Sequence, residues 1–194
     1  MKGVTDLPIA LAALIFGLLL KKQKRNDWML LFLLVALSAV MGAAVHLLRL
    51  TPTVRRIVWT VLYALLYEDI RRFSLLMTAY ISGCRAQECR AVWWTEGLLY
   101  LCTILVLMTH ELHSIYILVV FMVIMLVRIA VCLARYRFRP ARATGLMTLL
   151  VFPVTLQALA DVISAAVVAE HLLIVAGQVI AYSIGLRSAE PEKV

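Results

Sequence analysis

The run WMLLFLLVALSAVMGAAVHLL, residues 28–48, decides the fold class that the sequence predicts. Its 21 residues include no Asp, Glu, Lys or Arg. A helix needs about 20 apolar residues to cross a hydrocarbon core about 30 Å thick, and it satisfies its backbone amides within its own segment. We therefore expect a membrane-spanning helix here, over residues 28–50.

The whole chain has the composition of an integral membrane protein. Of its 194 residues, 64% are hydrophobic and 15% are charged, and the mean hydropathy is +0.96. Soluble domains are only about 45–50% apolar. The net charge of +8 would suggest nucleic acid in a soluble protein, but in a membrane protein such an excess mostly reflects topology. The expected partner is the lipid bilayer, and no nucleic acid is expected.

Seven apolar segments reach or approach the length of a membrane span. They lie near residues 5–20, 28–50, 56–82, 91–109, 114–134, 143–160 and 162–186. Basic residues follow the first segment instead of preceding it, which favours a helix over a signal peptide. The predicted fold is an all-α, polytopic seven-transmembrane helix bundle over residues 1–186, with a short polar cytoplasmic tail at 187–194.

Basic residues predict the orientation of this bundle, because cytoplasmic loops are enriched in Lys and Arg. On one side the loops and the tail hold Lys21, Lys22, Lys24, Arg25, Arg85, Arg90, Arg135, Arg137, Arg139, Arg142, Arg187 and Lys193. The other side holds only Lys2, Arg49, Arg55 and Arg56. We expect the N-terminus outside and the C-terminus in the cytoplasm.

Four ionisable residues interrupt the third predicted span: Glu68, Asp69, Arg71 and Arg72. A lone charge at the bilayer centre costs at least about 2.5–3.5 kcal/mol, so isolated charges are disfavoured. Three interpretations are open. The acids and arginines pair within one helix at i,i+3 and i,i+4 spacing, the helix breaks at 68–72, or an acid lines a water-filled cavity. We favour the first, a self-compensated cluster.

Two histidines, His46 and His171, lie inside apolar segments, where an imidazole needs a hydrogen-bonding partner or a metal. Both fall in the predicted outer half of the bundle. With nearby carboxylates they could hold zinc with an open position for water, lowering the pKa of that water toward about 7. The competing interpretation is a His–Asp network that only holds helices together.

Further residues in the outer half could complete such a site. Asp161 and His110, or His113 in place of His110, are candidate metal ligands, although both loop histidines also fit a solvated turn. Asp6 and Glu170 are the candidate catalytic residues, either orienting a histidine or acting as a base. The predicted metal ligands are therefore His46, His171, Asp161 and His110.

Three segments resemble those of a known superfamily. They are VTDLPIALAALIFGLLL (residues 4–20), opened by Asp6, the run at residues 28–48 with small residues leading to His46, and HLLIVAGQVIAYSIGLR (residues 171–187). Together they resemble small bacterial seven-helix proteins of unknown function related to the CREST superfamily. That superfamily includes the alkaline ceramidases and the progestin and adipoQ receptors.

The resemblance implies a seven-helix bundle in a bacterial plasma membrane, with a zinc site and hydrolysis of lipid amides. The zinc ligands would be a second-helix histidine, a third-helix aspartate and seventh-helix histidines, and His46 and His171 match two of these positions. The superfamily's second-helix serine corresponds to Gly42 here, with Ser38 one turn further away.

Two functions follow as hypotheses. The first is a membrane-embedded, zinc-dependent hydrolase acting on a lipid. The second is a non-enzymatic bundle, such as a receptor-like or accessory module or a small transporter, whose buried polar residues stabilise packing or shape a ligand cavity. Haem ligation by paired histidines is a third, minor alternative. The sequence contains no P-loop, G-x-G-x-x-G or G-x-S-x-G motif, so the corresponding nucleotide-binding and serine-esterase motifs are absent.

Overall fold

The protein is seen in a computed structural model that describes residues 2–82, 101, 123, 126–127, 129–130, 134 and 164–187. These residues form four long helices: α1 (Lys2–Lys22), α2 (Asn26–Leu47), α3 (Pro52–Ser82) and α7 (Ser164–Arg187). No strand occurs among them. The all-α part of the prediction is therefore confirmed for the described chain. The predicted spans at 91–109, 114–134 and 143–160 lie outside these ranges, apart from a few single residues.

The helix boundaries follow from local chemistry. A tight turn joins α1 to α2, and Lys24 adopts a positive φ of 58° within it. The second helix ends at Leu47, earlier than the predicted residue 50, because Leu48 is extended (φ −93°, ψ 142°). The third begins at Pro52, where a proline is tolerated because the first-turn N–H groups have no helical acceptor.

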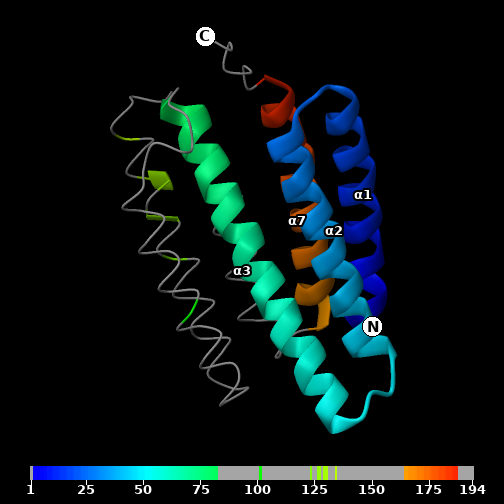
Figure 1. Cartoon of the computed structure of the whole chain (residues 1–194). Helices are drawn as coiled ribbons and strands as arrows, with labels where there is room; N and C mark the ends of the chain where they lie inside the picture. Colours follow the sequence, from blue (N-terminus) through cyan, green and yellow to red (C-terminus); the bar gives the residue numbers. More distant parts are fainter. Residues whose placement is uncertain are drawn as a thin grey trace.

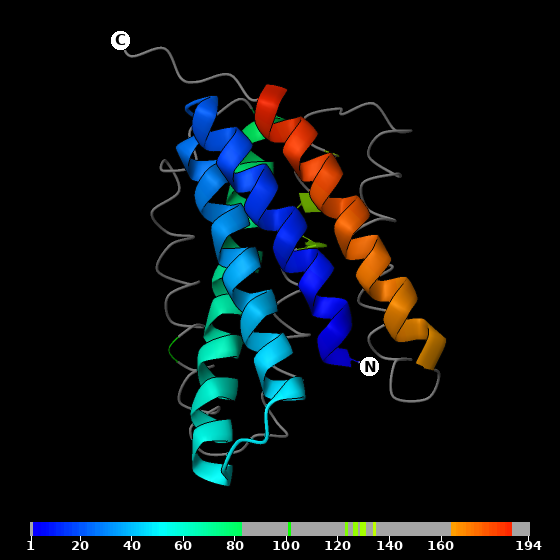
Figure 2. The same cartoon turned by 90° about the vertical axis from the view of Figure 1, so that its right-hand side faces the viewer.

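The first helix, α1, packs against both α2 and α7, and α2 also packs against α3. Figures 1 and 2 show that α1 is antiparallel to α2 and parallel to α7. The close approach of α7 depends on Gly185, where an added Cβ would lie 3.0 Å from Trp28 Cγ and 3.3 Å from Leu20 Cδ2. Trp28 and Leu20 are themselves buried. The end of α7 therefore rests directly on the turn between α1 and α2.

The third helix is continuous through residues 68–72. The interpretation that the chain breaks at these charged residues is therefore wrong. The reason is that ion pairs within the helix satisfy the side chains without disturbing the backbone. With 31 residues at about 1.5 Å each, α3 is about 46 Å long, which exceeds the hydrocarbon core of a bilayer.

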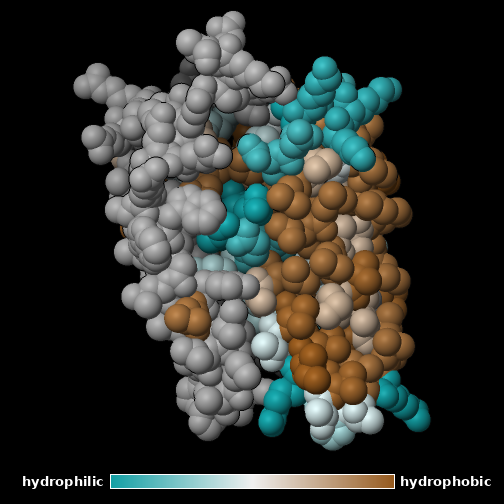
Figure 3. Space-filling model, in the orientation of Figure 1, coloured by the Kyte–Doolittle hydropathy of each residue, from teal (hydrophilic) through white to brown (hydrophobic). Residues whose placement is uncertain are grey.

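The outer face of α1 is apolar along most of its length. Its exposed side chains are Val4, Leu7, Leu11, Leu14, Ile15, Leu18 and Leu19, which recur every three or four residues over about 22 Å. Figure 3 shows this face as a hydrophobic surface over α1 and α2, with hydrophilic ends above and below. Soluble monomers rarely expose so large an apolar patch, whereas membrane and protein-binding surfaces do.

One helix in the described part of the chain is long and apolar enough to cross a membrane. This is α2, with 22 residues and a mean hydropathy of 2.4 in its most apolar window, of which half is buried. The stretch His171–Arg187 is apolar but shorter. Core helices of soluble proteins and signal sequences share these properties. The seven predicted crossings therefore stay a prediction.

Candidate functional site

Asp6 and His171 form a polar pair between the first and last helices. Asp6 lies near the start of α1 and His171 in the first half of α7, and the Oδ1 and Nε2 atoms are 2.9 Å apart. An ionised carboxylate only accepts hydrogen bonds, so Nε2–H donates when Asp6 is charged. Both side chains are largely buried, with 16% and 15% exposed. The pair therefore connects α1 to α7 in a partly desolvated position.

The second helix, α2, also lies against this pair, next to the carboxylate of Asp6. An added Cβ at Gly42 would lie 3.2 Å from Asp6 Oδ2, so the absence of a side chain lets the carboxylate lie against the α2 backbone. The resemblance described above implies a serine at the position of Gly42. In the structure the glycine instead provides room for Asp6.

His46 lies at the end of α2 and contacts α3 through its ring. It lies one turn beyond Gly42 on α2, its side chain is exposed, and its ring meets Trp59 of α3 edge-on, with centroids 5.9 Å apart. Trp59 in turn stacks on Tyr63 at 5.5 Å. His46 is therefore associated with α3, whereas His171 is associated with α1.

The structure tests only part of the predicted zinc site. Within the ranges that it describes, no group of three or more His, Cys, Asp or Glu residues is placed to hold a metal ion. Asp161, His110 and His113 lie outside those ranges, as does the side chain of Glu170. Zinc binding, and the catalytic roles of Asp6 and Glu170, stay predictions.

A second polar contact joins α2 to α3. Ser38 Oγ lies 2.9 Å from Asp69 Oδ2 and 3.0 Å from the carbonyl oxygen of Val35. Asp69 is buried, and its Oδ1 has no hydrogen-bond partner among the residues that the structure describes. The sequence predicts an ion pair of Asp69 with Arg72, but the described residues contain none, because Asp69 faces α2 and meets Ser38 instead.

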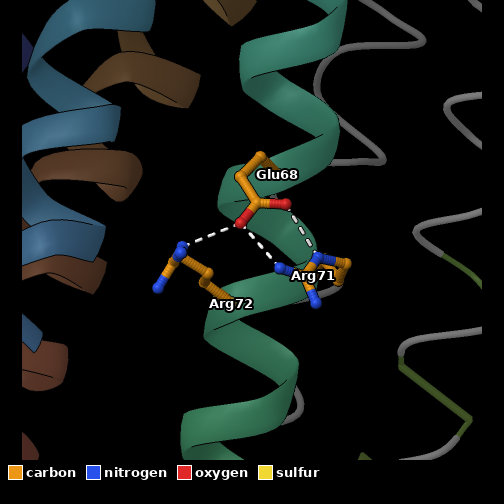
Figure 4. A network of polar contacts seen from close by, with 3 residues as sticks. All are labelled: Glu68, Arg71 and Arg72. Carbon is orange, nitrogen blue, oxygen red and sulfur yellow. Dashed lines mark hydrogen bonds and ion pairs between the residues drawn. The ribbon is translucent and has the colours of Figure 1, made fainter. Parts of the chain in front are cut away.

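Glu68 is the centre of the charged cluster on α3 (Figure 4). Its two oxygens accept from Arg71 Nε and Nη2, each at 2.7 Å, and Oε1 also accepts from Arg72 Nε at 2.8 Å. These are the i,i+3 and i,i+4 pairs that the spacing predicts. The prediction of pairing within one helix is therefore confirmed for Glu68, Arg71 and Arg72.

Sequence reasoning missed Gln178, a buried amide on α7. Its Nε2 donates to the carbonyl oxygen of Ile9 on α1 at 3.3 Å, while its Oε1 meets no hydrogen-bond partner within the described part of the chain. The available signal was an amide inside the apolar run HLLIVAGQVIAY. Gln178 follows His171 by seven residues, so both contacts lie along the side of α7 that faces α1.

These features define an all-α bundle whose helices are joined by buried polar contacts. A model of a family of unknown function, DUF6962, matches residues 1–183, and the protein belongs to this family. No curated protein and no solved structure shows significant similarity to the chain. The resemblance to the CREST superfamily stays a prediction.

Proposed function

We propose that the protein is a multi-pass integral membrane protein that crosses the bilayer seven times. The apolar outer face of α1 supports this setting, since lipid is the solvent that such a face requires. The parallel orientation of α1 and α7 (Figure 1) also supports it, because a first and a last span are parallel when the number of crossings is odd.

The distribution of basic residues supports an orientation with the N-terminus outside. Lys21, Lys22 and Lys24 are exposed at the turn after α1, and Arg187 is exposed at the end of α7, which packs against that turn. Arg49 and Arg55 are exposed at the opposite end. The end that collects lysines, together with the C-terminus, is the cytoplasmic one in this proposal.

Within this setting the polar contacts best fit a non-enzymatic bundle, such as a receptor-like or accessory module or a small transporter. One observation carries this choice, the Asp6–His171 contact at 2.9 Å. It joins the first helix to the last, and Gly42 leaves room for the carboxylate against α2. Hydrogen bonds between membrane helices each contribute about 0.6–2 kcal/mol to association. Asp6 and His171 therefore act as a structural connection in this proposal.

Conservative substitution tests this role. His171→Gln keeps a side-chain donor, so we expect the detergent-purified protein to retain most of its thermal stability. His171→Leu leaves Asp6 without its partner, and such a loss costs about 1–3 kcal/mol. Equal melting temperatures for the leucine variant and the unchanged protein would contradict the structural role.

A zinc-dependent lipid amide hydrolase is the second candidate, because a carboxylate beside a histidine is also found where the histidine binds a metal. Metal-ligating histidines almost always donate their other ring N–H to a carboxylate or carbonyl, and the contact of His171 Nε2 with Asp6 Oδ1 is of this kind. Elemental analysis of the purified protein separates the two candidates. Stoichiometric zinc that is lost on His46→Ala or His171→Ala supports the hydrolase, and zinc-free folded protein supports the structural bundle.

A further inference from the structure

Arg72 on α3 has more hydrogen-bonding capacity than its neighbours use. Its Nε donates to Glu68 Oε1, an oxygen that also accepts from Arg71 Nη2. Within the part of the chain that the structure describes, neither Nη1 nor Nη2 of Arg72 has a hydrogen-bond or ion-pair partner. Because each Nη carries two hydrogens, one edge of this guanidinium fork is available to an acceptor from outside the protein.

The charges around Arg72 are only partly compensated. Glu68 supplies one negative charge, and both of its oxygens bind Arg71, whose side chain is 10% exposed. Asp69 is the other nearby acid, but its Oδ2 is directed to Ser38 on α2. A guanidinium stays charged under all ordinary conditions. The neighbouring acids therefore compensate the positive charge of Arg72 less than that of Arg71.

The side chain of Arg72 can also be reached from outside. It is 30% exposed, three times as much as that of Arg71. Figure 4 shows Arg72 extending from α3 toward the ribbons of α2 and α7, while Arg71 extends the opposite way. Figure 3 shows a hydrophilic patch about half-way along the molecule, bordered by the hydrophobic surface of α1 and α2. Arg72 is therefore partly open to solvent on the side of α3 that faces α2 and α7.

We propose that Arg72 binds the anionic phosphate group of a ligand at this position. Arginine matches phosphate geometrically because two parallel N–H groups can bind two oxygens. Glu68 holds the Nε edge of the guanidinium and thereby turns the Nη edge toward the ligand. The phosphate can come from a free phosphate ion, or from a phospholipid whose headgroup leaves the membrane interface and reaches Arg72 while its chains pack on the apolar face.

The first arm of the test uses inorganic phosphate and the full chain in detergent. Thermal unfolding is followed while phosphate is titrated at constant ionic strength. We expect phosphate to raise the melting temperature of the unchanged protein, and Arg72→Gln to weaken the apparent affinity about tenfold or more, because charge-assisted bonds are lost. Lys22→Gln is the matched control, since it removes the same charge from an exposed site and should leave the response unchanged.

The second arm uses vesicles of phosphatidylcholine with or without phosphatidic acid, whose exposed phosphate carries more negative charge. Stabilisation by phosphatidic acid but not by phosphate supports the site and shows that its ligand is a lipid. Stabilisation by phosphate but not by phosphatidic acid also supports the site and shows that its ligand is the free ion. If Arg72→Gln does not fold, Arg72→Lys keeps the charge without the fork and is expected to bind several-fold more weakly. The proposal is overturned if neither phosphate nor phosphatidic acid raises the melting temperature of the unchanged protein. It is also overturned if the Arg72 variants show the same rise in melting temperature as the unchanged protein.

The lipid arm rests on the proposed membrane setting, but the phosphate arm does not. Failure of the membrane proposal would appear in the labelling of the two ends of α2, which is independent of Arg72. A failed anion titration with correct labelling would therefore reject only the binding site.

Discussion

At the residue scale, single atoms decide where the helices of this protein meet. Gly42 and Gly185 are both on buried interfaces, and a methyl group at either would lie within 3.2 Å of a neighbouring side chain. At Gly17 the nearest atom, Phe32 Cβ, would be 3.4 Å away, which is ordinary van der Waals contact. The three glycines are alike in sequence but differ in what a side chain would meet.

Gly185→Ala should destabilise the protein, because the Trp28 ring is buried and cannot move away from a new methyl group. Overpacking of this kind costs about 1–3 kcal/mol. Gly17→Ala is the matched control and should be neutral or stabilising, since alanine is favoured over glycine in a helix by about 1 kcal/mol. Thermal unfolding of both variants measures the difference, and equal melting temperatures would show that the α7 contact with Trp28 is not tight.

At the element scale, α3 shows how a helix carries four charged residues within the short stretch 68–72. Glu68 accepts three hydrogen bonds from two arginines one turn away, so most of the compensation is internal to the helix. Asp69 instead accepts a hydrogen bond from Ser38 on α2. The same stretch therefore combines a cluster stabilised within α3 with a contact that joins α3 to its neighbour.

Glu68→Gln should be strongly destabilising, because it removes the negative charge that binds the largely buried Arg71. Breaking a buried pair costs about 3–5 kcal/mol, and partial exposure of Glu68 places this case toward the lower end of that range. Asp27→Asn is the control, since it neutralises an exposed acid on α2. If Glu68→Gln and Asp27→Asn melt alike in detergent, water rather than Glu68 compensates the arginines.

Ser38→Ala tests the contact between α2 and α3. It removes the hydroxyl that donates to Asp69 Oδ2, and among the described residues no other group donates to this buried carboxyl group, a loss of about 1–3 kcal/mol. Ser183→Ala is a matched control, because Ser183 is exposed and bonds only the carbonyl of Val179 in its own helix. Chemical denaturation of the two variants should separate them clearly, and equal midpoints would remove the role assigned to Ser38.

At the scale of the whole molecule, polar residues lie at the two ends of the bundle and an apolar surface lies between them. The turn between α1 and α2 and the end of α7 gather exposed basic residues at one end, and an apolar face lies between that end and the other (Figure 3). Such a distribution matches a bilayer with two aqueous sides. It also places the Asp6–His171 pair at the end of the bundle opposite the lysine-rich turn.

Cysteine labelling in intact cells tests the orientation. In a chain whose four native cysteines are replaced by alanine, Lys24→Cys should react with a membrane-impermeant maleimide only after the cells are opened. Thr51→Cys, at the other end of α2, should react in intact cells. Labelling of both positions from the same side would contradict a membrane crossing by α2.

The sequence by itself determined what depends on neighbours along the chain. The length of the apolar run at residues 28–48 predicts the helix α2. The pairing of Glu68 with Arg71 and Arg72 follows from their spacing, because residues three and four apart are neighbours on the surface of a helix. The tertiary structure decided the contacts between helices, including Asp6 with His171, Ser38 with Asp69, and His46 with Trp59. Such contacts depend on how each helix is rotated about its axis and which helix it packs against. An apolar sequence leaves both undetermined, since its polar residues are few and its helix faces are similar.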